Sequence, residues 1–264
     1  MIKKMISVWV HKLLLPRGRQ YTARPDMEVG WEKEIIEFGK KQICMLWYKN
    51  TTLPSKGIIV LSHPYLAEAK SFFLIRGHAE MYIRNQYQVV LFDFNGFGES
   101  PFVDFNYKED LSIVADFVQL KEKNLPVFGH GVSFGASHTI VYSTVDKNVF
   151  QKITVENCLY SNLSYYKKRN LKLHYLMIGL MKIFPGVNKD HDYVKSISKL
   201  IGVKDVLFIY NNMDDLTTIA MGKSLQDACN KPSRFMTFDG IHLMAFQDNK
   251  DEYAESVITF LQNN

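Results

Sequence analysis

The stretch that decides the fold is Val127-Phe128-Gly129-His130-Gly131-Val132-Ser133-Phe134-Gly135, an apolar run that ends in G-x-S-x-G and leads into a helix-like segment. A serine on a sharp strand-to-helix turn leaves no room for side chains two positions before or after it, so both become glycine. The following helix points unbonded N–H groups at any anion beside the hydroxyl. The pattern therefore predicts a nucleophile elbow, and a plain strand–helix turn is the alternative reading.

Composition indicates one globular domain. At 264 residues with 47% apolar content, the chain can bury one sizeable core, with or without an inserted lid. Three widely spaced cysteines, Cys44, Cys158 and Cys229, predict neither a disulfide framework nor a metal-ligand cluster, and favour a reducing, cytoplasmic compartment. The sequence has no apolar run of the length that a membrane-spanning helix needs.

Positive charge is concentrated in two segments. Residues 1–24 carry a net charge of +6 without any acid, and residues 161–202 also carry +6, which leaves −7 for the remainder of a chain whose total is +5. Both basic segments are rich in apolar residues. This combination favours an anionic surface or head group over a nucleic-acid groove, so we expect peripheral contact with an anionic membrane surface and no nucleic-acid partner.

The order of elements predicts an α/β fold. Short apolar runs, several of them continuous as in buried parallel strands, alternate with helical patterns. The expected strands are 34–38, 43–48, 58–62, 89–93, 126–130, 153–158, 206–210 and 234–238, and the expected helices are 68–85, 107–123, 134–145, 217–230 and 251–261. Two antiparallel strands followed by βα units predict a doubly wound, mostly parallel eight-stranded sheet flanked by helices.

Polar motifs follow successive predicted strands. They are Leu61-Ser62-His63-Pro64-Tyr65, Asp93-Phe94-Asn95-Gly96-Phe97-Gly98-Glu99-Ser100, the elbow, Tyr210-Asn211-Asn212-Met213-Asp214-Asp215, and Asp239-Gly240-Ile241-His242. In open α/β sheets, ligands bind at the carboxyl ends of the strands. We therefore expect these five motifs to converge on one site.

In this set and order of motifs the chain resembles the α/β-hydrolase superfamily, from about residue 30 to the C-terminus. It looks most like the lipase, esterase and thioesterase branch, including monoglyceride-lipase-like serine hydrolases with a short cap. The resemblance implies a hydrolase core over 25–160 and 203–264 and a small helical cap or lid over 161–202. The charge pattern adds a basic amphipathic N-terminal arm over 1–24.

The resemblance also implies a catalytic triad. Ser133 is the expected nucleophile, His242 its general base and Asp214 the acid that orients the histidine, in the order usual for the fold. Asp215 is the close alternative to Asp214, and Glu156 is a further rival because some hydrolases take their acid from that strand. The alternative for His242 is an ordinary surface-loop histidine without a catalytic role.

The expected oxyanion donors are the backbone N–H groups of Phe134 and Tyr65. Two residues depart from the family pattern: Pro64 replaces a glycine and has no N–H of its own, and Asn211 replaces the glycine usual at the start of the acid turn. We expect His63 to hold the oxyanion loop through hydrogen bonds.

The cap is expected to be a one- or two-helix lid that lines an apolar acyl pocket. Candidate substrate-binding residues are Tyr165, Leu176, Leu180 and Phe184. Residues 2–15 have the pattern of an amphipathic helix, for which an interfacial anchor and an arm packed on the core are both open.

Together these features predict a serine hydrolase that cleaves a small-molecule acyl ester or thioester, with an apolar, lipid-like acyl group. The resemblance implies no cofactor and no metal. An acyltransferase and a non-catalytic acyl-ligand binder on the same fold are the alternatives. The oligomeric state stays open.

Overall fold

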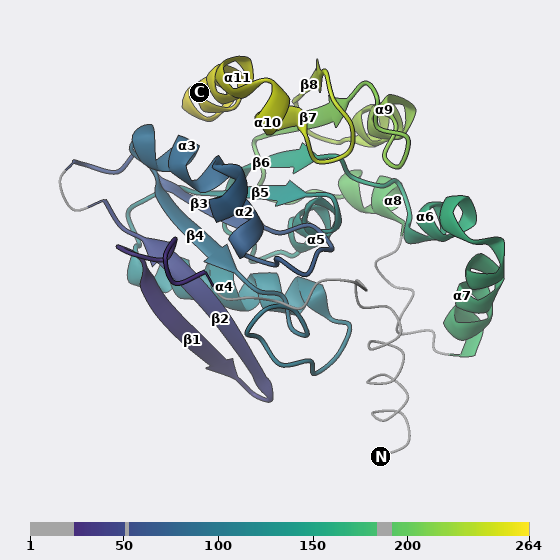
Figure 1. Ribbon diagram of the computed structural model, residues 1–264, viewed down its shortest axis with the longest axis horizontal. Coiled ribbons are helices and arrows are strands. Elements are labelled where there is room, and N and C mark those ends of the chain that lie inside the picture. Colours follow the sequence, from purple (N-terminus) through teal and green to yellow (C-terminus); the bar gives the residue numbers. More distant parts are fainter. Residues whose placement is uncertain (1–23, 51–52, 184–191, 264) are drawn as a thin grey trace.

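A twisted, mostly parallel sheet forms the centre of the molecule. The computed structural model describes residues 24–50, 53–183 and 192–263, with the backbone alone for Arg169 (Figure 1). Within these ranges eight strands form one sheet in the order β1-β2-β4-β3-β5-β6-β7-β8, and only the pairings β1–β2 and β2–β4 are antiparallel. The predicted fold is thus confirmed. The strands are β1 Glu32–Phe38, β2 Lys41–Tyr48, β3 Ile58–Ser62, β4 Gln88–Phe92, β5 Val127–Val132, β6 Phe150–Glu156, β7 Asp205–Asn211 and β8 Ser233–Phe238.

Helices cover both faces of the sheet, which is why β3, β4 and β5 are buried along their whole length. Side chains alternate between the faces: Ile58 and Val60 of β3 join one apolar cluster, and Ile59 and Leu61 join the other. The first cluster is covered by α4 Tyr107–Lys121, α5 Phe134–Tyr142, α8 Tyr193–Ile197 and α9 Ile219–Ala228. The second is covered by α2 Ser71–Arg76, α3 His78–Arg84, α10 Ala245–Asp248 and α11 Lys250–Gln262.

The single helix predicted over 68–85 is wrong, because the segment forms two short helices, α2 and α3. Gly77 separates them with a φ of +83°, a left-handed conformation that glycine adopts readily. Its N–H donates to the carbonyl oxygen of Leu74 at 3.2 Å and so caps α2. The break lets Phe73 and Tyr82 both reach the sheet. The other four predicted helices are present and differ only at their ends.

Two helices, α6 Asn162–Arg169 and α7 Leu171–Ile183, extend from the carboxyl edge of the sheet within the segment predicted as the cap (Figure 1). The chain leaves and rejoins the core at one neck, where Ser161 pairs with Asp192 and the N–H of Tyr193 donates to the carbonyl oxygen of Tyr160 at 3.1 Å. Helix α8 lies in the same predicted segment, but its Tyr193 and Ile197 are buried in the core.

The amphipathic helix predicted over 2–15 and the cap residue Phe184 lie outside the described residues. Among the residues that are described, no helix has both the length and the apolar composition needed to cross a membrane.

The turn from β5 into α5 is the most tightly packed turn of the carboxyl edge. A β-carbon on Gly131 would lie 2.5 Å from the Cα of Ala136, and one on Gly135 would lie 1.8 Å from the carbonyl oxygen of Ser62. Backbone atoms therefore occupy the space on both sides of Ser133, as the G-x-S-x-G pattern predicts. The close approach also fixes the end of β3 against the start of α5.

We predict that Gly135→Ala destabilises the protein by about 1–3 kcal/mol, because the backbone of Ser62 must move to admit the methyl group. Gly179→Ala in α7 is the matched control: nothing lies within 4 Å of its β-carbon position, and alanine is the better helix former. Urea unfolding followed by circular dichroism measures both. Equal stability of Gly135→Ala and the wild type would contradict the packing described.

Candidate active site

Ser133 lies at the turn between β5 and α5 in a strained backbone conformation. Its φ of 53° and ψ of −111° fall outside the regions that residues with a β-carbon favour. The N–H of Ser133 donates to the carbonyl oxygen of Glu156 at 2.8 Å, which anchors the turn to the neighbouring strand β6. The strained turn presents the hydroxyl at the carboxyl edge of the sheet.

The side chains of Ser133, His242 and Asp214 form a continuous chain of hydrogen bonds. The Oγ of Ser133 lies 3.2 Å from Nε2 of His242, and Nδ1 of His242 lies 2.5 Å from Oδ2 of Asp214. Asp214 comes from the loop after β7 and His242 from the loop after β8. The N–H of Met213 donates to the carbonyl oxygen of Gly240 at 3.1 Å, so the two loops are bonded side by side.

Asp214 is buried, yet its carboxylate is surrounded by donors. Oδ1 accepts the N–H groups of Leu216 at 2.8 Å and Thr217 at 2.9 Å. Oδ2 accepts from His242, from the hydroxyl of Thr217 and from Nδ2 of Asn157 at 2.9 Å. Burial by itself would raise the pKa of Asp214, but the bonds from His242 and Thr217 outweigh it and hold the pKa below its usual value. The carboxylate is therefore ionised at neutral pH.

The two rival acids have other surroundings. The side chain of Asp215 is 95% exposed and lies 3.9 Å from the ammonium group of Lys168. Glu156 is buried, and its Oε2 accepts from the hydroxyl of Tyr253 at 2.5 Å and lies 3.2 Å from Nε2 of His130. Of the three candidates, the carboxylate that contacts His242 is that of Asp214.

The predicted oxyanion donors lie beside each other. Phe134 is the first residue of α5, so its N–H is one of the four that have no acceptor within the helix. The ring of Tyr65 packs edge-on against the ring of Phe134, with centroids 5.2 Å apart. The arrangement places the loop after β3 next to the N-terminus of α5.

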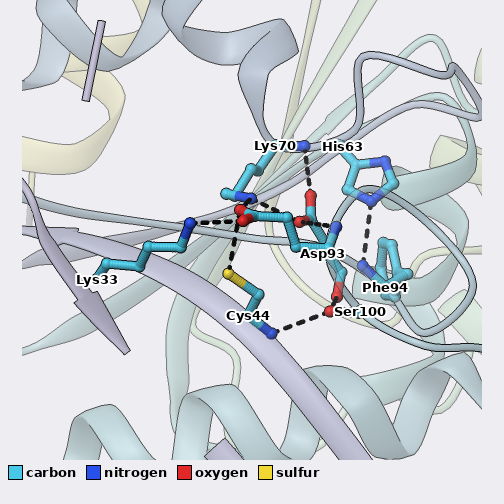
Figure 2. Close-up of polar contacts among 8 residues, drawn as sticks. Lys33, Cys44, His63, Lys70, Asp93, Phe94 and Ser100 are labelled. Atoms are coloured by element: carbon cyan, nitrogen blue, oxygen red, sulfur yellow. Dashed lines mark hydrogen bonds and ion pairs between the residues drawn. The ribbon is translucent and has the colours of Figure 1, made fainter. Parts of the chain in front are cut away.

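His63 holds this loop, as expected from the sequence. Its Nδ1 lies 2.8 Å from the carbonyl oxygen of Pro64, and its Nε2 accepts the N–H of Phe94 at 3.1 Å (Figure 2). These partners assign the proton to Nδ1 of a neutral ring. Burial lowers the pKa of His63 to about 4. The loop is thus fixed by a side chain although Pro64 lacks an N–H.

A buried ion-pair cluster binds the same loop to the turn after β4. The ammonium group of Lys70 lies 2.6 Å from Oδ2 of Asp93 and 2.7 Å from Oε2 of Glu99, and the N–H of Lys70 donates to Oδ1 of Asp93 at 2.9 Å (Figure 2). A β-carbon on Gly98 would lie 2.3 Å from Asp93, so glycine is needed for the turn to wrap around the carboxylate. Asp93 therefore orders this turn.

The cluster also holds a set of potential metal ligands. Atoms of Cys44, Asp93 and Glu99 lie within 4.8 Å of one another. Lys70 contacts both carboxylates and Lys33 lies 2.5 Å from Glu99, so two ammonium groups balance the two carboxylates. Burial raises the pKa of Cys44 to about 12, which keeps its thiol protonated. This donor set suits an ammonium group better than a metal ion.

Comparisons with known proteins support the architecture. Nothing matches among known family models or among curated proteins. Solved structures do match. An esterase of Pyrococcus furiosus superposes with a TM-score of 0.72 at 16% identity, over 94% of this chain and 95% of the esterase. The chain has the α/β-hydrolase fold. Two further structures share this fold. An enol-lactonase of Burkholderia xenovorans superposes with a TM-score of 0.64 at 17% identity, over 87% of this chain and 100% of the lactonase. The thioesterase domain of a curacin biosynthetic pathway superposes with a TM-score of 0.59 at 13% identity, over 88% of this chain and 99% of that domain.

The candidate substrate-binding residues of the cap differ in how far they are buried. Tyr165 and Leu180 are partly buried, whereas Leu176 is half exposed. Burial raises the pKa of Tyr65, and the hydroxyl groups of Tyr166 and Tyr165 raise it further, so these two side chains of α6 lie near Tyr65.

Two site residues were not predicted from the sequence. The hydroxyl of Thr217 donates to Asp214 and lies 3.2 Å from Nδ1 of His242, and Asn157 reaches Asp214 from the end of β6. The spacing of Asp214 and Thr217 resembles an Asx-type turn, so the contact between them could have been predicted from the local sequence. The contact of Asn157 could not, because 57 positions separate it from Asp214.

Beneath the elbow, on the α2–α3 side of the sheet, lies a buried polar network. The hydroxyl of Tyr82 lies 2.7 Å from Nδ1 of His130, whose Nε2 lies 3.2 Å from Glu156. His78 packs among aromatic rings, with its Nε2 4.0 Å from Glu156. Burial lowers the pKa of His78 to about 4, although Glu156 opposes this shift.

We predict that stability falls as the pH drops from about 6.5 to about 4. Unfolded His63 and His78 bind a proton near pH 6.5 and the folded residues only near pH 4, so unfolding takes up protons in this window. His78→Phe should lower the slope of unfolding free energy against pH by up to about 1.4 kcal/mol per pH unit. Urea unfolding at a series of pH values measures the slope, and an unchanged slope would contradict the prediction.

Proposed function

We propose that this protein is a serine hydrolase that cleaves an acyl ester or thioester through an acyl-serine intermediate. The observation that carries the proposal is the hydrogen-bonded chain from Ser133 through His242 to Asp214. It combines a nucleophile, a base within hydrogen-bond reach and an ionised acid that orients the base. The three side chains come from three loops at the carboxyl edge of the sheet, where this type of fold binds ligands.

In the first step, Oγ of Ser133 attacks the acyl carbon while Nε2 of His242 takes the hydroxyl proton. The imidazolium forms next to Asp214, whose carboxylate stabilises it and holds Nδ1 protonated. The bond from the acyl carbon to the leaving oxygen or sulfur then breaks, and His242 delivers its proton to that atom. In the second step, water attacks the acyl-serine, His242 takes a water proton and returns it to Oγ, and the acid leaves.

The negative charge that develops on the acyl oxygen needs donors that are already in place. We assign these donors to the N–H groups of Phe134 and Tyr65. The ring contact between the two residues supports this assignment, as do the bonds of His63 that fix the Tyr65 loop. The positive end of α5 favours the oxyanion as well.

The proposed substrate has an apolar, lipid-like acyl group. Tyr165 and Leu180 are the cap residues whose partial burial is compatible with lining an acyl pocket, while the half-exposed Leu176 is a poorer candidate. The names of the esterase, thioesterase and lactonase that share the fold support acyl chemistry in general. Peripheral contact with an anionic membrane surface is part of this proposal.

Ser133→Ala should abolish both ester turnover and labelling by a fluorophosphonate probe while the fold stays intact, because one exposed oxygen is lost and no core volume changes. Gel fluorescence of the labelled protein, p-nitrophenyl ester hydrolysis and circular dichroism measure the three properties. Labelling that persists in Ser133→Ala would overturn the assignment of the nucleophile. A wild type that neither labels nor turns over any acyl ester would instead favour a non-catalytic binder.

Asp214→Asn should lower kcat by up to about 10⁴-fold, because an amide cannot hold Nδ1 of His242 protonated or stabilise the imidazolium. Asp215→Asn is the matched control and should change kcat little, since its side chain is 95% exposed and does not contact His242. Steady-state hydrolysis of a p-nitrophenyl ester compares them. If the two variants exchange phenotypes, the acid is Asp215; if neither matters, Glu156 becomes the candidate.

A further inference from the structure

Helix α7 has an unusual distribution of apolar side chains. Met177 and Met181, one turn apart, are buried on its inner side. Its opposite side carries large apolar side chains that are between 50% and 69% exposed, namely Leu171, Tyr175, Leu176 and Ile183. A surface helix of a globular protein normally presents polar residues outward. The outward face of α7, defined by these four residues, is largely apolar instead.

The charge around this face has one sign. Residues 161–189 contain no aspartate and no glutamate. The exposed lysines of the two cap helices are Lys167, Lys168, Lys172 and Lys182. On α7 itself, Lys172 and Lys182 are exposed on the same side as these apolar side chains, and they are adjacent in sequence to Leu171 and Ile183. A helix face that combines apolar side chains with lysines is typical of segments that lie in the head-group region of a membrane.

We propose that the outward face of α7 docks on an anionic phospholipid bilayer. Aliphatic and aromatic side chains would enter the head-group boundary, while the lysines contact lipid phosphates and carboxylates. A second copy of the chain fits less well. A two-fold interface would place this acid-free, basic face against itself and bring like charges together. A nucleic-acid backbone would leave the apolar side chains without partners.

The position of α7 in the fold gives docking a consequence. Helix α7 packs on α6, with Nδ1 of His174 3.1 Å from the carbonyl oxygen of Leu163, and α6 carries Tyr165 and Tyr166 over the Tyr65 loop. A bilayer on the outward face would therefore bind the same two-helix cap whose α6 approaches the Tyr65 loop. The inference goes beyond the proposed hydrolysis, because a bilayer can bind whether or not Ser133 is a nucleophile.

The experiment is sedimentation of the full chain with vesicles, either of phosphatidylcholine alone or with about one third phosphatidylserine. We expect strong binding to the anionic vesicles that falls steeply as salt rises from about 0.05 to about 0.5 M. Tyr175→Ser combined with Ile183→Ser should lower the partition coefficient at least about tenfold. Lys172→Gln combined with Lys182→Gln should lower it about tenfold or more on anionic vesicles only.

Leu120→Ser on α4 is the matched control, because Leu120 is 71% exposed but lies on another surface; it should bind like the wild type. Ser133→Ala should also bind like the wild type, so failure of the hydrolase assignment and failure of docking are separate results. Two outcomes overturn the proposal: binding by the Tyr175→Ser and Ile183→Ser variant that equals the wild type, or a dimer in sedimentation velocity that this variant abolishes without any vesicle binding.

Discussion

The close approach of α5 to the end of β3 is the constraint on which the carboxyl edge depends. Because a β-carbon at Gly135 would lie 1.8 Å from the carbonyl oxygen of Ser62, the elbow and the start of the next loop cannot separate without breaking the packing. The contact sets two positions at once. It holds Ser133 in its strained conformation and brings Tyr65 against Phe134. The N-terminus of α5 and the Tyr65 loop thus lie together beside Ser133, as the proposed stabilisation of a developing oxyanion requires.

Buried charges act together with aromatic packing to fix the loops around this centre. Asp214 is ionised although buried, because five donors share its two oxygens. On the opposite side of the site, Lys70 joins Asp93 and Glu99. Such groups are costly to desolvate, and removing one partner leaves an uncompensated charge, so each loop has few alternative arrangements. The cost of an unpaired buried charge therefore both fixes the geometry of the site and limits which substitutions the loops tolerate.

The sequence predicted the sheet and the strand-to-helix turn at Ser133 well because their signals are local. Short apolar runs mark buried strands, and two glycines around Ser133 mark the elbow. Signals that depend on distant contacts were weaker. The choice between Asp214 and Asp215 depends on which carboxylate contacts His242, and the sequence does not show this because the two residues are adjacent. Asn157 reaches the acid only because β6 and β7 are adjacent in the sheet. The break at Gly77 was missed because the apolar pattern continues across it, and only the left-handed φ reveals two helices.

The cap is attached to the core at the neck formed by Ser161 and Asp192. Residues beyond Ser161 return to the core at Asp192, and α8, directly after the neck, is buried against α5 and α9. The described part of the cap can therefore be held firmly at its base while α7 presents apolar side chains outward and α6 faces the Tyr65 loop. A site that accepts an apolar acyl group gains from such an arrangement, since the substrate is scarce in water and concentrated in a bilayer. Under the two proposals, the exposed apolar face of α7 and the tyrosines of α6 serve one substrate class from two sides of the cap.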